Sequence, residues 1–244
     1  MITIIIQARM SSARLPGKVM KDISGHPMLF HLVERCRRSR RADMVLVATS
    51  VGRDDDVIAG FCKTENIECY RGALNNVLER YYEVAKEAGA RGIVRITADC
   101  PLIDPRIIDQ CVEAFEKSEI DYISNVNPKR TFPRGLDVEV FSFRALEKAH
   151  HEALTPFERE HVTPYLWENK KGEFILGSPV IAPPSHQSDV CLAVDYPEDL
   201  DMIKEVYMEL YREGEIVNVR EAIRFLTEHK EIANLNRVRG RQSF

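Results

Sequence analysis

The chain has 244 residues, of which 44% are hydrophobic and 30% charged, and its formal net charge at pH 7 is -4. A chain of this length can bury a hydrophobic core of its own and suits one large α/β domain. Its acidic balance argues against a dedicated nucleic-acid-binding protein, because such domains carry an excess of basic residues.

The cysteines and the start of the chain indicate where the protein works. Its six cysteines include no Cys-x-x-Cys pair and no neighbouring histidine cluster, which argues against a zinc site or a disulfide framework. The apolar run at 2–6 turns polar at Gln7 and is too short for the apolar core of a signal peptide. No later stretch approaches the length of a membrane span. We therefore expect a cytoplasmic protein that does not bind membranes.

Short apolar runs alternate with amphipathic stretches over the first half of the chain. The predicted strands are residues 2–6, 44–49, 67–70 and 92–97. The predicted helices begin at Pro27, at Asp54, at Asn75 or Asn76, and at Asp104. Strands that alternate with helices of this kind predict a mostly parallel sheet with helices on both faces.

This regular alternation ends after about Tyr122. The sequence then predicts a loop-rich stretch at 124–136 and a strand at 136–143. A second loop, with three prolines, is predicted at 178–188. A core strand at 190–194 and an amphipathic helix at 197–212 follow it. We interpret the chain as a single domain over residues 1–244. Residues 125–185 are interpreted as an insertion that covers an active site or forms a subunit contact.

The loop after the first predicted strand concentrates basic and hydroxyl side chains. Between Gln7 and Lys18 it contains two arginines, two serines and a glycine. Ligands of open parallel sheets bind beyond the carboxyl ends of the strands, and a triphosphate needs fixed cations and hydrogen-bond donors. Gly17 would let the backbone approach phosphates, and Pro16 would stiffen the turn that presents Lys18. The loop has neither the P-loop nor the dinucleotide-binding glycine pattern, so residue types leave a solvated loop open as well.

Two aspartates come at the ends of predicted strands. Asp99 follows the strand at 92–97, and Asp195 follows the strand at 190–194. A carboxylate in such a place can hold Mg²⁺ together with phosphates and water, although a lone strand-end aspartate is more often a turn or capping residue. Glu198 and Asp199 are expected to cap the helix that follows Asp195.

Four segments resemble one enzyme family. The loop Arg9-x-x-Ser12-x-Arg14-Leu15-Pro16-Gly17-Lys18 resembles the nucleotide-binding loop of the CMP-sugar synthetases, the cytidylyltransferases for 3-deoxy-manno-octulosonate and the acylneuraminates. It is most similar to their relatives, the spore-coat polysaccharide biosynthesis cytidylyltransferase-like proteins. Similar segments are Arg71-Gly72-x-x-x-x-Val77-Leu78-Glu79-Arg80-Tyr81, Ala98-Asp99-Cys100-Pro101-Leu102-Ile103 and Val194-Asp195-Tyr196-Pro197-Glu198-Asp199-Leu200. The resemblance covers about 1–212 and implies a Rossmann-like sheet of the nucleotide-diphospho-sugar transferase type.

The same resemblance implies roles for individual residues. The implied nucleotide-binding residues are Ala8, Arg9, Ser12, Arg14, Gly17, Lys18 and Arg71. Lys18, Arg14 and Asp99 are the implied catalytic residues, and Asp99 and Asp195 are the implied ligands of Mg²⁺. Many family members carry a further acid where this chain has Ala193, which weighs against a two-metal arrangement.

The predicted activity is transfer of CMP from CTP to an acidic sugar or a similar small acceptor in surface polysaccharide biosynthesis, with release of pyrophosphate. Arg134, Arg159 and His161 are candidates for holding the acceptor. A glycosyltransferase that uses a nucleotide sugar on a similar fold remains an alternative. The resemblance to the CMP-sugar synthetases also favours a homodimer.

Two charged runs have both a structural and a functional interpretation. The arginine-rich run at 35–41 is expected to be the solvated end of a helix, and the alternative is a non-catalytic nucleotide-binding or assembly protein that uses this run. The run at 54–56 is superficially similar to the Asp-x-Asp motif of glycosyltransferases, but its position at a helix start favours capping.

Overall fold

The structure is a computed structural model that describes residues 1–117 and 119–236. Its centre is a six-stranded sheet in the order β5-β4-β1-β6-β8-β7. The strands are β1 (Ile2–Gln7), β4 (Met44–Ser50), β5 (Glu68–Gly72), β6 (Gly92–Thr97), β7 (Tyr122–Ser124) and β8 (Glu139–Ser142). The first four are parallel, whereas β8 runs antiparallel to both β6 and β7. The prediction of a mostly parallel sheet is confirmed.

Strand β1 is buried on both faces because it lies between β4 and β6. Side chains of a strand alternate between the two faces, so Ile4 and Ile6 pack into one hydrophobic core and Ile5 into the other. In the register of the sheet, Gln7 lies opposite Ala48 and Thr97. The loops that follow β1 and β6 therefore leave the sheet side by side.

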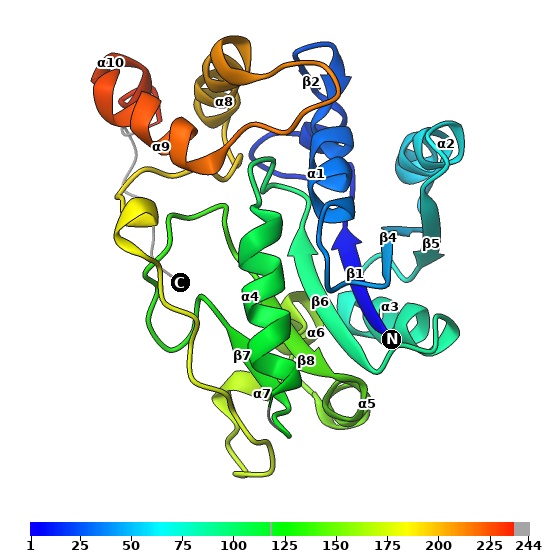
Figure 1. The fold of residues 1–244 in the computed structure, drawn as a ribbon. Coiled ribbons are helices and arrows are strands. Elements are labelled where there is room, and N and C mark those ends of the chain that lie inside the picture. The colour runs from blue at the N-terminus through cyan, green and yellow to red at the C-terminus, as the bar shows by residue number, and fades with distance from the viewer. Residues whose placement is uncertain (118, 237–244) are drawn as a thin grey trace.

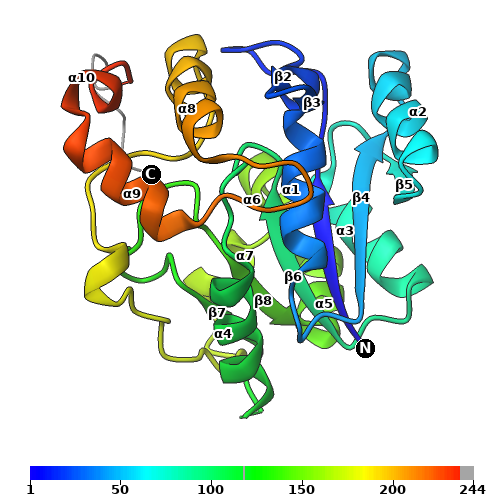
Figure 2. The ribbon, with the colours of Figure 1, turned by 45° about the horizontal axis from the view of Figure 1, so that its top comes forward.

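Helices cover both faces of the sheet, as Figures 1 and 2 show. The core on the near side of Figure 1 contains residues of α1 (Met28–Arg37), α2 (Asp56–Thr64), α4 (Pro105–Glu116), α8 (Pro197–Leu210) and α9 (Val219–Glu228). The other core contains residues of α3 (Val77–Glu87), α5 (Phe143–Glu152) and α7 (Pro164–Glu168), and α6 (Pro156–His161) packs against α3. The remaining elements are β2 (Asp22–Ile23), β3 (His26–Pro27), α10 (Lys230–Ala233) and the 3₁₀ turns η1 (Lys18–Met20), η2 (Arg53–Asp55) and η3 (Pro184–His186).

Two predicted helix starts are confirmed by their capping hydrogen bonds. The side chain of Asn76 accepts a hydrogen bond from the backbone N–H of Glu79 at the start of α3. Asp104 accepts one in the same way from Arg106 at the start of α4, where Pro105 occupies the first turn. Such caps satisfy backbone donors that have no partner within the helix, so they define where a helix can begin.

The predicted core strand at 190–194 is wrong. This segment forms only an isolated bridge between Cys191 and Arg134, although Leu192 and Val194 are buried. The N–H of Leu192 donates to the carbonyl of Arg134, and the N–H of Val194 donates to the carbonyl of Asp99. The segment is thus apolar because it is buried, but its hydrogen bonds go to loops rather than to a neighbouring strand.

The arginine-rich run at 35–41 also differs from its prediction. Arg37, Arg38, Arg40 and Arg41 are exposed as expected, but Arg35 is only 1% exposed. The guanidinium of Arg35 donates to the carbonyl oxygens of Ile103, at 2.5 Å, and Val217, at 2.8 Å. Arg35 therefore joins the turn before α4 to the segment before α9, which are far apart in the sequence.

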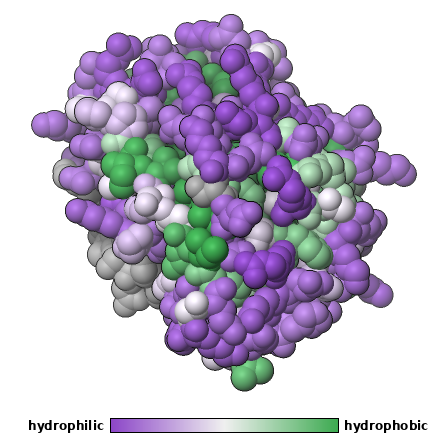
Figure 3. Space-filling model, turned by 60° about the horizontal axis from the view of Figure 1, so that its bottom comes forward, coloured by the Kyte–Doolittle hydropathy of each residue, from purple (hydrophilic) through white to green (hydrophobic). Residues whose placement is uncertain are grey.

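The surface is polar with local apolar patches. On the face shown in Figure 3, hydrophilic side chains predominate and apolar ones gather in separate patches. Among residues 1–117 and 119–236, no helix combines the length and the apolar character that crossing a lipid bilayer requires.

Candidate active site

A cavity of about 360 Å³ lies beyond the carboxyl ends of β1 and β6. Its walls come from the loop after β1, from β6 and the turn after it, from α3 and α6, and from the segment before α8. After β1 the chain forms β4 on one side of β1, and it forms β6 on the other side of β1 only later. The cavity therefore lies where the order of the strands reverses. Open α/β sheets bind their ligands at such a point.

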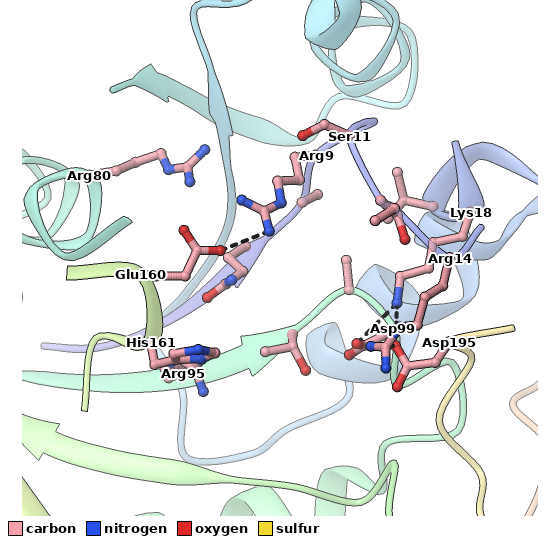
Figure 4. A pocket seen from close by; sticks show the side chains of 17 residues that line it. Arg9, Ser11, Arg14, Lys18, Arg80, Arg95, Asp99, Glu160, His161 and Asp195 are labelled. Carbon is pink, nitrogen blue, oxygen red and sulfur yellow. Dashed lines mark hydrogen bonds and ion pairs between the residues drawn. The ribbon is translucent and has the colours of Figure 1, made fainter. Parts of the chain in front are cut away.

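One side of the cavity contains a cluster of Arg14, Lys18, Asp99 and Asp195, which we call the Lys18 cluster (Figure 4). The Lys18 Nζ donates to Asp99 Oδ2 at 3.2 Å, to Asp195 Oδ1 at 3.0 Å and to the carbonyl of Val194 at 2.7 Å. Arg14 Nη2 lies 2.8 Å from the same oxygen of Asp195. The loop after β1 therefore meets both aspartates at one point.

The charges of this cluster stabilise one another. Burial by itself would lower the pKa of Lys18, but the attraction of Asp99 and Asp195 outweighs it and raises that pKa. Burial would raise the pKa of Asp99, and the Lys18 charge and a hydrogen bond from Thr97 instead hold it below its usual value. Lys18 and Asp99 are consequently both charged at neutral pH.

The loop after β1 reaches the cavity because of a tight turn at Gly17. Gly17 has a φ of 68°, a conformation that side chains disfavour, and its N–H donates to the carbonyl of Met10 at 2.9 Å. A Cβ atom on Gly17 would also lie 3.1 Å from the Cε of Met10. Gly17 does not line the cavity, so it shapes the loop that presents Lys18.

Asp55 holds the same loop from the side of β4. Its buried carboxylate accepts hydrogen bonds from the N–H of Met10 at 2.7 Å and from the N–H and hydroxyl of Ser50. It makes no side-chain capping bond to α2, so the capping prediction for 54–56 is wrong at Asp55. The reason is that the Met10 and Ser50 donors already occupy both of its oxygens.

Replacing Asp55 by alanine is expected to reduce the free energy of unfolding by about 1–3 kcal/mol, because the N–H of Met10 loses its buried acceptor. The midpoint of chemical denaturation measures this change. Asp54→Ala, one residue earlier and exposed, is the matched control. Equal stability of the two variants would contradict the role assigned to Asp55.

The backbone that carries Asp195 is held by the start of α8. Asp199 is fully buried, and its Oδ2 accepts hydrogen bonds from the N–H groups of Asp195 and Tyr196, each at 2.9 Å. The prediction that Asp199 caps this helix is confirmed. The hydrogen bond from Asp195 to Asp199 has a second effect, because it fixes the backbone of Asp195, whose side chain contacts Lys18.

The other side of the cavity contains Arg9, Arg80, Arg95, Glu160 and His161, which we call the Arg80 cluster (Figure 4). Arg9 Nη2 pairs with Glu160 Oε1 at 2.7 Å, which connects the loop after β1 to α6. Arg95 Nη1 pairs with Glu139 Oε2 at 2.6 Å. Burial lowers the pKa of His161, so this side chain is neutral at neutral pH.

The sequence prediction of site residues missed Arg80 and Arg95. The available signal for Arg95 is its position within a buried strand, on the same face as Ile93 and Thr97, because charged residues are rarely buried without a partner. Arg80 belongs to a helix whose other buried residues are largely apolar, and it is 2% exposed.

The structure brings most of the other predicted residues together. Those that line the cavity are Ala8, Arg9, Ser12, Arg14, Lys18, Asp99, His161 and Asp195. The predicted residues that do not line it are Gly17, Arg71, Arg134 and Arg159. Arg71 lies at the end of β5, where its guanidinium pairs with Asp56 at 2.7 Å and donates to the carbonyl of Ser50 at 2.9 Å.

A mostly parallel sheet with a cation-lined cavity at the carboxyl ends of its central strands defines an open α/β protein with a site suited to an anionic ligand. The family model described as cytidylyltransferase matches residues 3–232, so the chain belongs to the cytidylyltransferase family. The resemblance stated from the sequence motifs is thereby confirmed at the level of the family.

Three relatives illustrate the range of this family. An uncharacterized protein of Methanocaldococcus jannaschii is 36% identical over 236 residues, covering 95% of this chain and 93% of its own. The spore coat polysaccharide biosynthesis protein SpsF of Bacillus subtilis is 28% identical over 241 residues, covering 95% and 96%. The 3-deoxy-manno-octulosonate cytidylyltransferase of Geobacter sulfurreducens is 40% identical over 111 residues, which is 46% of this chain and 44% of that protein.

Two solved structures have the same fold. A cytidylyltransferase from Leptospira borgpetersenii superimposes with a TM-score of 0.87 at 29% identity, covering 100% of this chain and 98% of that one. The CMP:2-keto-3-deoxy-manno-octonic acid synthetase, solved in complex with CTP, has a TM-score of 0.62 at 19% identity, covering 85% and 98%. At that identity the second comparison supports the fold alone.

Proposed function

We propose that the protein transfers CMP from CTP to a hydroxyl group of an acidic sugar or similar small acceptor and releases pyrophosphate. The observation that carries this proposal is the contact of Lys18 with both Asp99 and Asp195 inside the cavity. The family is that of the cytidylyltransferases. The names of the relatives from Geobacter sulfurreducens and Bacillus subtilis support an acidic sugar as the acceptor and a role in surface polysaccharide biosynthesis.

In this proposal the loop after β1 binds the nucleotide. Arg9, Ser12, Arg14 and Lys18 line the cavity and supply cations and a hydroxyl donor for the phosphates. The backbone at Ala8 would contact the base. Arg71 lies outside the cavity at the end of β5, so its contact with the nucleotide stays a prediction. Gly17 takes part through the shape of the loop rather than through direct contact.

The reaction is an in-line attack of the acceptor oxygen on the α-phosphorus of CTP. The new bond joins this oxygen to phosphorus, and the hydroxyl proton is released to solvent. The bond from phosphorus to the oxygen that bridges to the β-phosphate breaks, and pyrophosphate leaves with that oxygen. Phosphoryl transfer depends mainly on positioning and on neutralisation of charge. Lys18 and Arg14 supply fixed positive charge on the side of the cavity where Asp99 and Asp195 lie.

Asp99 and Asp195 fit the proposed magnesium site. One oxygen of each lies close to the same cation, the Lys18 Nζ, so both carboxylates already face one positive charge. The part of the chain that the structure describes contains no group of three or more His, Cys, Asp or Glu side chains suited to a metal ion. Mg²⁺ commonly uses one or two carboxylates together with substrate phosphates. When bound, it would offset phosphate charge and lower the pKa of the attacking hydroxyl.

The acceptor is proposed to bind under α6. Of the acceptor candidates from the sequence, His161 lines the cavity, whereas Arg134 and Arg159 do not. Glu160 and His161 of α6 lie within 125–185, which supports a covering role for part of this segment. The alternative role of the segment as a subunit contact stays a prediction.

Pyrophosphate release tests the proposed function. The protein is incubated with CTP, MgCl₂ and individual sugar acids, including 3-deoxy-manno-octulosonate and N-acetylneuraminate. We expect release that depends on the acid and on the metal and is weaker with ATP, GTP or UTP. Consumption of a nucleotide sugar without pyrophosphate would instead support the glycosyltransferase alternative. The absence of pyrophosphate with every acid tried would contradict the proposal.

A further inference from the structure

The Arg80 cluster contains buried hydrogen-bond donors that the proposed roles of CTP and magnesium leave unused. Among the described residues, Nε and Nη1 of Arg80 and Nε of Arg95 have no hydrogen-bond partner. Both side chains line the cavity on the side away from Lys18 (Figure 4). A buried donor without a partner costs stability, and the cost is larger for a charged group, so a ligand that accepts these bonds is expected.

The charges of the Arg80 cluster indicate that this ligand is an anion. Arg9 and Arg95 are already paired, with Glu160 and Glu139 respectively. Burial and the nearby charge of Arg9 lower the pKa of Arg80, and its interactions with Tyr81, Asp55 and Glu160 only partly offset these two effects. Among the described residues Arg80 forms no ion pair, and its Nε and Nη1 have no hydrogen-bond partner, so it is the arginine of the cluster best suited to an anionic group of the ligand.

The neighbours of both arginines hold them in place. Arg80 packs against β5 so closely that a Cβ atom on Gly72 would lie 3.2 Å from its Cγ. The partner of Arg95, Glu139, is itself fixed by the hydroxyl groups of Tyr122, at 2.6 Å, and Thr163, at 2.8 Å. Fixed guanidinium groups favour a planar anion that accepts two hydrogen bonds at once.

The cavity also offers polar contacts beside the two arginines. The buried Oε1 of Gln7 has no hydrogen-bond partner within the described residues, and Gln7 lines the same cavity. Gln7 lies opposite Thr97 in the sheet, and Thr97 lines the cavity as well. A ligand with a hydroxyl group next to its anionic group can donate a hydrogen bond to the Oε1 of Gln7.

We propose that Arg80 and Arg95 bind the carboxylate of the acceptor and thereby select polyhydroxylated sugar acids over their uncharged analogues. This inference rests on the proposed function and deepens it, because it places the acid group of the acceptor on α3 and β6. Arg134 and Arg159, the arginines predicted from the sequence, are not part of this subsite.

Lysine substitutions test the subsite while keeping its charge. Arg80→Lys and Arg95→Lys each remove the planar set of donors, and the lysine at 95 can still pair with Glu139. Calorimetry measures binding of 3-deoxy-manno-octulosonate, of N-acetylneuraminate and of their carboxamides to protein saturated with Mg²⁺ and α,β-methylene-CTP. Arg91→Lys is the matched control, because Arg91 is exposed just before β6.

We expect the wild-type protein to bind at least one acid, and to bind its carboxamide about ten-fold or more weakly, as expected for loss of a charge-assisted hydrogen bond. Each lysine variant should weaken binding of the acid by about the same factor and reduce the difference between acid and carboxamide. The affinity for the CTP analogue should not change in either variant.

Other outcomes would overturn the subsite. Equal losses for acid and carboxamide would show that the arginines act only on the structure of the cavity. A loss of affinity for the CTP analogue would assign them to the nucleotide, and failure of both acids to bind would exclude the carboxylate. If an acid binds through Arg80 and Arg95 but CTP releases no pyrophosphate, the subsite stands and the proposed reaction fails.

Discussion

Replacing Asp99 by asparagine is expected to lower kcat/KM for pyrophosphate release by about 10²-fold or more, the effect of losing one strong electrostatic contact to the reacting groups. Asparagine has nearly the same shape but no charge to hold Mg²⁺ or to pair with Lys18. Lys18 keeps its hydrogen bonds to Asp195 and to the Val194 carbonyl, so the loop should stay in place. Steady-state kinetics with saturating Mg²⁺ measures the change.

The control for this variant is Asp54→Asn, which removes an exposed carboxylate outside the cavity. Both variants should have the circular dichroism spectrum of the wild-type protein. Near-normal pyrophosphate release by Asp99→Asn, with an acceptor that the wild-type protein uses, would refute the assignment of Asp99 as a metal ligand.

Replacing Lys18 by methionine is expected to have two opposite effects. It should weaken binding of CTP about ten-fold or more, because a charge-assisted contact to phosphate is lost. Without nucleotide it should strengthen binding of Mg²⁺, because in the wild-type protein the Lys18 Nζ occupies the position between Asp99 and Asp195. Calorimetric titrations with CTP and with MgCl₂ alone measure the two effects separately.

Lys63→Met, on the exposed side of α2, controls for the loss of one positive charge. Unchanged affinity of Lys18→Met for CTP would remove the loop after β1 from the nucleotide site. Weaker binding of Mg²⁺ by the same variant would show that Lys18 organises the two carboxylates for the metal rather than competing with it.

Local signals in the sequence predicted the sheet and several helix starts. The strand at 92–97 has the bounds of β6, and Asn76 and Asp104 begin their helices as predicted. These features depend on neighbouring residues, because apolar periodicity and caps act over a few positions. The segment at 190–194 was mispredicted for the same reason, since an apolar run indicates burial and does not show where its hydrogen bonds go.

The site itself depends on contacts between distant parts of the chain. Lys18 and Asp195 are 177 positions apart, and the residue types of the loop after β1 are by themselves compatible with a solvated loop. Arg80 gives no local signal of its role, because a buried charge on an amphipathic helix looks like part of the polar face of that helix. The sequence predicts a cap at Asp55 because its true contacts, Met10 and Ser50, lie outside the helix that Asp55 precedes.

The ion pair between Arg9 and Glu160 is expected to limit which anions can bind in the cavity. A phosphate group that takes up the Arg9 guanidinium must first displace a carboxylate of α6. Inorganic phosphate would make too few contacts to offset that loss, whereas a triphosphate bound as proposed would also reach Arg14 and Lys18. The pair is therefore expected to discriminate against small competing anions, and arrival of the nucleotide would free α6 to adjust around the second substrate.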